Sequence, residues 1–225
     1  MNGYIRIALL FIINFICFKL VGFWFGIISS FIVIYRILTL IGITRTPIIY
    51  RGFFIDGISY TKDYLGPYSK HQEAFMEAGK LIETYKLKNF VVIALYYDSP
   101  STIEESKLRS SIGIYKKNIA KSEEIPEDFE KYCEQNGYNK NELPRADAIY
   151  SNWDYFNFIS MMIGIQKFYK LINNKLKDEY FKKQYKVDEK KLKAFIEVYE
   201  CHNNSMSFYV PITKGDNFMV FKKDK

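Results

Sequence analysis

An almost uninterrupted apolar stretch at residues 5–43 constrains this 225-residue chain more than any other feature. Its charged residues are Arg6, Lys19 and Arg36. A helix that crosses the roughly 30 Å of bilayer hydrocarbon needs about 20 apolar residues, and residues 20–43 supply them. A soluble domain gains nothing from such a stretch exposed at one end, so we expect a membrane anchor.

The anchor allows two layouts. One straight helix over residues 7–43 would be roughly 55 Å long, too long for one crossing. The first layout is a single span at about residues 20–40, preceded by an interfacial apolar segment, and it is our working expectation. The second is a short hairpin that turns near Lys19. A cleaved signal peptide fits poorly, because the stretch is too long and no A-x-A-like site follows it.

Basic residues near the anchor predict its orientation. Four basic residues lie toward or beyond the C-terminal end of the stretch, whereas Arg6 lies at its N-terminal end. The four are Arg36, Arg45, Arg51 and Lys62. The positive-inside rule then favours a cytosolic domain and a short N-terminus on the opposite side.

The composition of the remaining residues, 44–225, narrows the function. They carry 29 basic and 25 acidic side chains, a balance that does not favour nucleic-acid binding. The three cysteines of the chain fit reduced thiols better than a disulfide framework. His71 and His202 belong to no spacing typical of a metal site or a catalytic triad. The sequence therefore predicts no enzymatic activity, no cofactor and no metal.

Hydrophobic periodicity and turn signals predict an α+β domain. The expected strands cover residues 47–59 (one long strand or a pair), 90–97, 108–117, 146–155, 194–201 and 206–212. The expected helices cover 69–85, 127–135 and 156–181, with Ser69 capping the first of them. The order reduces to a duplicated β-α-β-β unit, and we expect two helices to pack on one face of an antiparallel sheet.

Several short segments occur in an order and spacing that resemble a known family. They are residues 64–68 (YLGPY), 92–100 (VIALYYDSP), 107–113 (KLRSSIG), 196–199 (IEVY) and 209–218 (YVPITKGDNF). Together with the α+β pattern and the anchor, they resemble GyrI-like (SOUL/gyrase-inhibitor) ligand-binding domains. Within that group the chain looks like the testis-expressed 264 family of endoplasmic-reticulum membrane proteins.

The resemblance implies a single-pass anchor at residues 1–43 and a cytosolic GyrI-like domain at residues 44–221. It also implies a role in selective autophagy of the endoplasmic reticulum (ER-phagy), with Atg8-type proteins and the p97/Cdc48 unfoldase as partners, bound directly or through an adaptor. The chain ends about ten residues after Gly215, without the family's acidic Atg8-binding tail. We therefore expect an adaptor similar to a receptor, with no nucleic-acid partner.

Residues 222–225 suggest where the protein resides. Lys222 and Lys223 occupy the fourth and third positions from the end. This placement looks like the dilysine retrieval signal of endoplasmic-reticulum membrane proteins. The signal requires a cytosolic C-terminus, which is the orientation that the positive-inside rule favours.

The main alternative is small-molecule binding. GyrI-like clefts are often lined by aromatic side chains around a carboxylate, which implies a ligand site formed by Glu197 with Tyr96, Tyr97, Trp153 and Tyr199. The same aromatic residues could instead be ordinary core. A third class is a hydrolase in which Glu197 acts as a general base. Burying Glu197 without a partner would be costly, so we expect either a cleft or a basic neighbour beside it.

Overall fold

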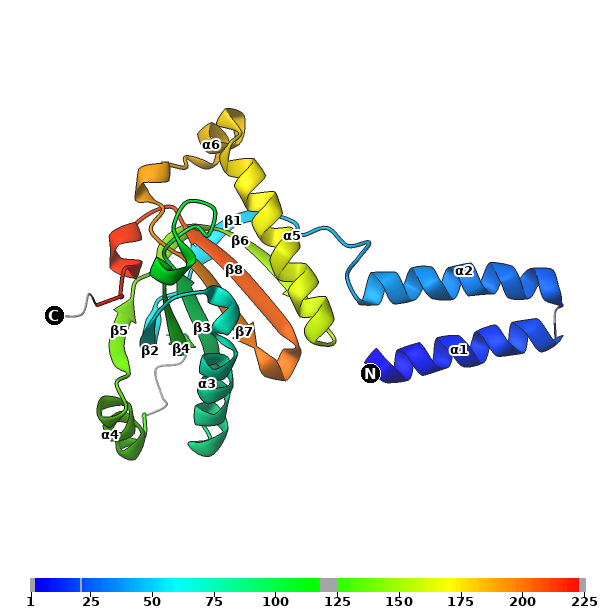
Figure 1. Cartoon of the computed structure of the whole chain (residues 1–225), viewed down its shortest axis with the longest axis horizontal. Coiled ribbons are helices and arrows are strands. Elements are labelled where there is room, and N and C mark those ends of the chain that lie inside the picture. Colours follow the sequence, from blue (N-terminus) through cyan, green and yellow to red (C-terminus); the bar gives the residue numbers. More distant parts are fainter. Residues whose placement is uncertain (1–2, 21, 118–124, 223–225) are drawn as a thin grey trace. The chain divides into compact units, whose positions relative to one another are not determined.

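The computed structural model describes residues 3–20, 22–117 and 125–222. The chain divides into two compact units. The first comprises residues 1–48 and 153–173 and contains the N-terminal helices. The second comprises residues 49–152 and 174–225 and contains the β-sheet (Figure 1).

The apolar stretch forms two antiparallel helices that lie side by side, α1 (Gly3–Leu20) and α2 (Phe23–Leu40) (Figure 1). Between them Gly22 adopts a φ of 102°, a conformation that favours glycine. These residues therefore fold as a helical hairpin. Among the described residues, α2 is the one helix long and apolar enough to cross a membrane.

A small polar junction follows α2 in the same unit. The Lys167 ammonium, on helix α5 (Phe158–Leu176), donates to the carbonyl oxygens of Gly42, Ile43 and Arg45 at 2.8, 2.5 and 2.6 Å. The Arg45 guanidinium lies 4.2 Å from the ring centroid of Trp153. The Trp153 indole nitrogen in turn donates to the Ser160 carbonyl at 2.9 Å. These contacts satisfy backbone groups that lack a helical partner beyond the end of α2.

The second unit is built on an eight-stranded sheet. The strand order is β1-β6-β8-β7-β3-β4-β2-β5. The strands are β1 (Tyr50–Phe54), β2 (Gly57–Leu65), β3 (Phe90–Tyr96), β4 (Arg109–Lys117), β5 (Asn139–Leu143), β6 (Ala146–Asp154), β7 (Phe195–Glu200) and β8 (Ser205–Pro211). The other helices are α3 (Gln72–Thr84), α4 (Glu127–Gln135) and α6 (Glu179–Tyr185).

The sheet contains the expected duplication. The segments β2-α3-β3-β4 and β6-α5-β7-β8 have the same chain order, and their strands lie in the equivalent orders β2-β4-β3 and β6-β8-β7. The two halves meet where β3 pairs antiparallel with β7. Helix α3 contacts β3 and β4. The predicted α+β class with an antiparallel sheet is therefore confirmed.

Two short connections curl the sheet. Residues 55–56 join β1 to β2, and residues 144–145 join β5 to β6. Strands β1 and β5 are the two edges of the sheet. Strand β2 lies next to the β5 edge, and β6 lies next to the β1 edge. Each connection therefore joins one edge to the strand beside the opposite edge. Two residues span only about 7 Å, so the sheet curls until its edges approach each other.

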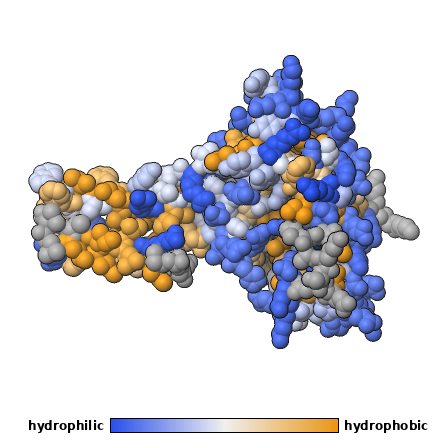
Figure 2. Space-filling view, turned by 180° about the vertical axis from the view of Figure 1, so that it is seen from behind, coloured by the Kyte–Doolittle hydropathy of each residue, from blue (hydrophilic) through white to orange (hydrophobic). Residues whose placement is uncertain are grey.

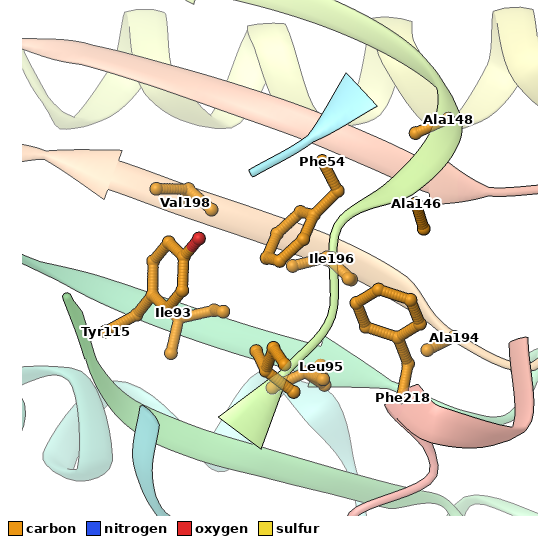
Figure 3. Packing of buried hydrophobic residues seen from close by; sticks show 11 residues of the cluster. Phe54, Ile93, Leu95, Tyr115, Ala146, Ala148, Ala194, Ile196, Val198 and Phe218 are labelled. Atoms are coloured by element: carbon orange, nitrogen blue, oxygen red, sulfur yellow. The ribbon is translucent and has the colours of Figure 1, made fainter. Parts of the chain in front are cut away.

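A hydrophobic core, the inner core, fills the inside of this curl (Figure 3). The Phe54 ring lies 5.4 Å from the Tyr115 ring and 5.2 Å from the Phe218 ring. All its members are 3% exposed or less. They are Phe54, Ile93, Leu95, Tyr115, Leu143, Ala146, Ala148, Ala194, Ile196, Val198 and Phe218.

Three local expectations differ from the structure. The predicted cap at Ser69 is wrong: residues 68–70 form a 3₁₀ turn, and α3 begins after His71 without a side-chain cap. The expected helix over 156–181 breaks, because the Asp178 carboxylate accepts from the Tyr180 backbone N–H at 2.9 Å and starts α6. Strand β5 was not expected, since its sequence NKNEL is almost wholly polar.

Neighbouring phenylalanines on β1 provide a test of the inner core. Phe54→Ala should lower the free energy of unfolding by about 3–5 kcal/mol, because it leaves a cavity among packed rings. Phe53→Ala, the matched control, should cost less than about 1 kcal/mol: Phe53 is 51% exposed and its ring contacts the Arg145 guanidinium at 4.6 Å. Urea unfolding of the full chain in detergent measures both. Equal losses would contradict the curled core.

Candidate functional site

The two faces of the central strands carry different chemistry. On β3, Ile93 and Leu95 point into the inner core, so Ala94 and Tyr96 face the side covered by α3. On β7, Ile196 and Val198 belong to the inner core. Because side chains alternate along a strand, Glu197 and Tyr199 share the α3 side with Ala94 and Tyr96. The register places Glu197 directly opposite Ala94.

Glu197 is a buried carboxylate held by tyrosines. It is 2% exposed, and Tyr199 Oη donates to its Oε2 at 2.5 Å. The Tyr96 hydroxyl also hydrogen-bonds to Glu197. Burial, followed by the Glu197 charge, raises the pKa of Tyr96 well above its ordinary value. The phenol therefore remains a hydrogen-bond donor to the carboxylate across the physiological pH range.

The two tyrosines that contact this carboxylate belong to a chain of neighbouring aromatic rings, which we call the aromatic layer. The Tyr96 ring lies 4.7 Å from the Tyr68 ring and 6.1 Å from the His71 ring, and Phe75 lies 5.2 Å from Tyr199. The layer comprises Tyr64, Tyr68, His71, Phe75, Tyr96 and Tyr199. Its first four members come from one segment, residues 64–75, which runs from the end of β2 into the first turn of α3.

His71, the one histidine of the layer, immediately precedes helix α3. The residue is 5% exposed, and its Nε2 lies 3.2 Å from the hydroxyl of buried Ser110. Its Nδ1 has no hydrogen-bond partner within the described part of the chain. Burial lowers the pKa of His71, so the imidazole is neutral at neutral pH. His71 was not among the expected site residues, although it follows the Gly-Pro turn at the start of the expected helix.

A carboxylate–guanidinium pair fixes the segment that carries Tyr68. Arg109 Nε and Nη2 donate to the two Asp98 carboxylate oxygens at 2.9 and 2.8 Å. This bidentate contact holds the pKa of Asp98 below its usual range. The Tyr68 hydroxyl donates to the Asp98 carbonyl oxygen at 2.9 Å. The ring of Tyr68 is thereby oriented toward Tyr96.

The expected ligand residues separate into three places. Glu197, Tyr96 and Tyr199 lie together, as the sequence analysis proposed for a site. Tyr97 lies on the opposite face of β3, where its hydroxyl donates to Ser111 Oγ at 2.9 Å, because consecutive strand residues point to opposite faces. Trp153 belongs to the other compact unit and makes the contacts with Arg45 and Ser160 given above.

The expected retrieval signal is described only at its first residue. The Lys222 backbone N–H donates to Asp63 Oδ2 at 2.9 Å, and its ammonium donates to Asn139 Oδ1 at 2.7 Å. Lys223 lies outside the described residues. Lys222 is therefore tied to strands β2 and β5.

The chemistry of the aromatic layer suits an organic cation. A buried carboxylate supplies negative charge, and the faces of tyrosine and phenylalanine rings attract cations through their quadrupoles. Over residues 3–20, 22–117 and 125–222, no group of three or more His, Cys, Asp or Glu side chains could hold a metal ion.

Comparisons with known proteins give only distant structural similarity. No family model and no curated protein matches the chain. Among solved structures, the EcmrR C-terminal domain is 10% identical with a TM-score of 0.43, covering 75% of this chain and 98% of its own. SAV2435 bound to tetraphenylphosphonium is 11% identical with a TM-score of 0.45, covering 74% and 94%.

A hydrolase from Listeria innocua is 8% identical with a TM-score of 0.42, covering 75% of this chain and 93% of its own. Identities and TM-scores this low transfer neither a ligand nor an activity to this chain.

The buried His71 predicts a pH dependence of stability. Its folded-state pKa lies below the unfolded value of about 6.5. At pH values between these two pKa values, the unfolded state therefore binds more protons than the folded state. The free energy of unfolding should therefore fall as the pH drops below about 6.5. His71→Phe keeps an aromatic ring and removes the titration, so it should flatten this fall.

Urea unfolding at several pH values between neutral and mildly acidic measures the effect, with His202→Phe at an exposed position as the control. Asp98, whose pKa is lowered, changes the free energy of unfolding only near and below about pH 4. It therefore does not affect the measurement between neutral and mildly acidic pH. Identical pH profiles for wild type and His71→Phe would contradict the assignment.

Proposed function

We propose that the chain is a membrane-tethered, non-enzymatic protein whose sheet unit binds a small organic cation at Glu197. One observation carries the proposal: a carboxylate that is 2% exposed lies on a central strand and accepts hydrogen bonds from two tyrosines of the aromatic layer. Removing a carboxylate from water costs several kcal/mol, and each tyrosine hydrogen bond to it returns only about 1.5–3 kcal/mol. A purely structural position on this face would be served better by an apolar residue.

The tyrosines fit a site that opens to its ligand. Tyr96 and Tyr199 satisfy the Glu197 oxygens when no cation is present. Rotation of a phenol away from the carboxylate would release one acceptor oxygen and leave the ring face beside it. A cation would then contact both the carboxylate charge and the ring faces.

The sequence resemblance implies a GyrI-like domain, and this identity is part of the proposal.

The tether rests on the apolar hairpin. Its helices expose large apolar side chains, including Phe15, Trp24 and Phe31 at 64%, 75% and 69%. Figure 2 shows hydrophobic residues gathered over this hairpin, whereas the surface of the sheet unit is mostly hydrophilic. Apolar patches of this kind mark interaction with a membrane or a partner.

The charge of Glu197 gives the test of cation binding. The full chain in lipid nanodiscs should bind tetraphenylphosphonium, and it should not bind tetraphenylborate, which has the same shape and the opposite charge. Glu197→Gln should weaken tetraphenylphosphonium binding about tenfold or more, since a charge-assisted contact of about 1.4 kcal/mol or more is lost.

Glu142→Gln removes the same charge from an exposed position on β5 and should leave the affinity unchanged. Isothermal titration calorimetry measures the affinities, with empty nanodiscs as the blank. Unaltered affinity in Glu197→Gln, with the fold intact by circular dichroism, would refute the site.

A second candidate is an endoplasmic-reticulum adaptor with a cytosolic sheet unit that recruits Atg8-type proteins or p97/Cdc48. The filled inner core favours it, because packed side chains occupy the enclosed face of the sheet and leave no room there for a ligand (Figure 3). The segment Phe195–Val198, which has the aromatic-x-x-aliphatic form, lies within β7. Because β7 pairs with both β3 and β8, it has no free edge for strand addition.

The adaptor proposal predicts that recruitment does not use this segment. Purified Atg8-type protein should bind the membrane-embedded full chain equally in wild type and in Val198→Ala. A pull-down from proteoliposomes measures it, and no binding by the wild type would remove direct recruitment. Residence in the endoplasmic reticulum is tested separately by microscopy of wild type and of Lys222→Ala/Lys223→Ala, which should leave that compartment.

A further inference from the structure

Polar side chains join the two apolar helices midway along their length. The Asn14 amide nitrogen on α1 donates to Ser30 Oγ on α2 at 3.2 Å, and its amide oxygen accepts from Ser29 Oγ. Both serine hydroxyls also lie 2.9 Å from the Gly26 carbonyl oxygen. A carboxamide in hydrocarbon needs such partners, because no water is present to satisfy it. The contact therefore suits two helices that lie in the same apolar environment.

The two helices are also matched in length and closely packed. Each contains 18 residues, which span about 27 Å, close to the roughly 30 Å of bilayer hydrocarbon. A Cβ atom at Gly26 would overlap the ring of Phe18, so a larger residue there would force the Phe18 ring to move. Small residues at helix contacts are typical of membrane-embedded pairs.

The basic residues divide unequally between the two ends of the hairpin. An antiparallel pair brings the beginning of α1 to the same end as the last turn of α2. Arg6 and Arg36 lie toward that end, and Arg45 and Arg51 follow it in sequence, whereas Lys19 lies toward the turn. Loops within about 15–20 residues of a membrane helix and rich in Lys and Arg remain in the cytosol.

We propose that α1 and α2 enter the bilayer together as a helical hairpin, joined by Asn14, Ser29 and Ser30. The turn lies on the far side, and the beginning of α1 and the sheet unit share the cytosolic side. The proposal rests on the membrane tether of the proposed function and is independent of the cation site. It replaces the expected single span, which would put the beginning of α1 on the opposite side.

Epitope tags test the topology in sealed microsomes that carry the full chain. With one tag before residue 1 and another after residue 225, added protease should remove both tags. Protection of the first tag alone would overturn the hairpin in favour of a single span, and protection of both would overturn the orientation. Release of the chain by alkaline carbonate would show instead that the membrane tether itself fails.

Cysteine pairs test the helix contact in the same membranes. In a background with Cys17, Cys133 and Cys201 replaced by serine, Asn14→Cys/Ser30→Cys should lose maleimide labelling after mild oxidation. Phe15→Cys/Ser30→Cys, the matched control, should keep its labelling, since Phe15 is 64% exposed. Labelling that survives oxidation in both pairs, or is lost equally in both, would refute the contact.

Discussion

The curl of the sheet is the constraint on which the rest of the second unit depends. Two-residue connections join strands that lie at opposite sides of an eight-stranded order. Once the sheet curls, one face of every central strand is enclosed, and large rings such as Phe54, Tyr115 and Phe218 fill it. The other face of the same strands carries Glu197, with its hydrogen bonds from Tyr96 and Tyr199.

Because side chains alternate along a strand, the two faces of β7 carry residues with different roles. Ile196 and Val198 stabilise the enclosed core, while Glu197 and Tyr199 lie in the aromatic layer. A substitution at Glu197 therefore leaves the inner core untouched, which is why a ligand defect and a folding defect can be separated there. The hairpin belongs to the other compact unit and has its own polar contact, so substitutions there can likewise test its membrane behaviour without altering the inner core.

Much of this architecture is predictable from local pattern, and its exceptions have physical reasons. Residues 206–212 alternate strictly, and residues 127–135 end in a turn at Gly137, so β8 and α4 appear where expected. Strand β5 pairs only with β2 and needs no apolar side chain except Leu143, which left no hydrophobic signal to read. The length of the apolar stretch allowed both a hairpin and a single span, and the contacts between the helices, such as Asn14 with Ser29 and Ser30, form only in the folded chain.

The site was predictable only in part. Glu197 and Tyr199 are two residues apart on one strand, so their proximity follows from sequence. The grouping of Tyr96 with Tyr97 ignored the alternation that separates them. His71 and Tyr68 come to Tyr96 through a fold of residues 64–71 that the Asp98–Arg109 pair holds in place, and no local pattern encodes such a long-range contact.

The curl stops short of a closed barrel, and this has a consequence for the behaviour of the protein in a crowded solution. Strands β1 and β5 remain as edges whose free backbone groups could accept a strand from a second molecule. Both edges carry charge: Arg51 on β1, and Lys140 and Glu142 on β5. The polar sequence that hides β5 from prediction is thus what protects the folded sheet from edge-to-edge aggregation.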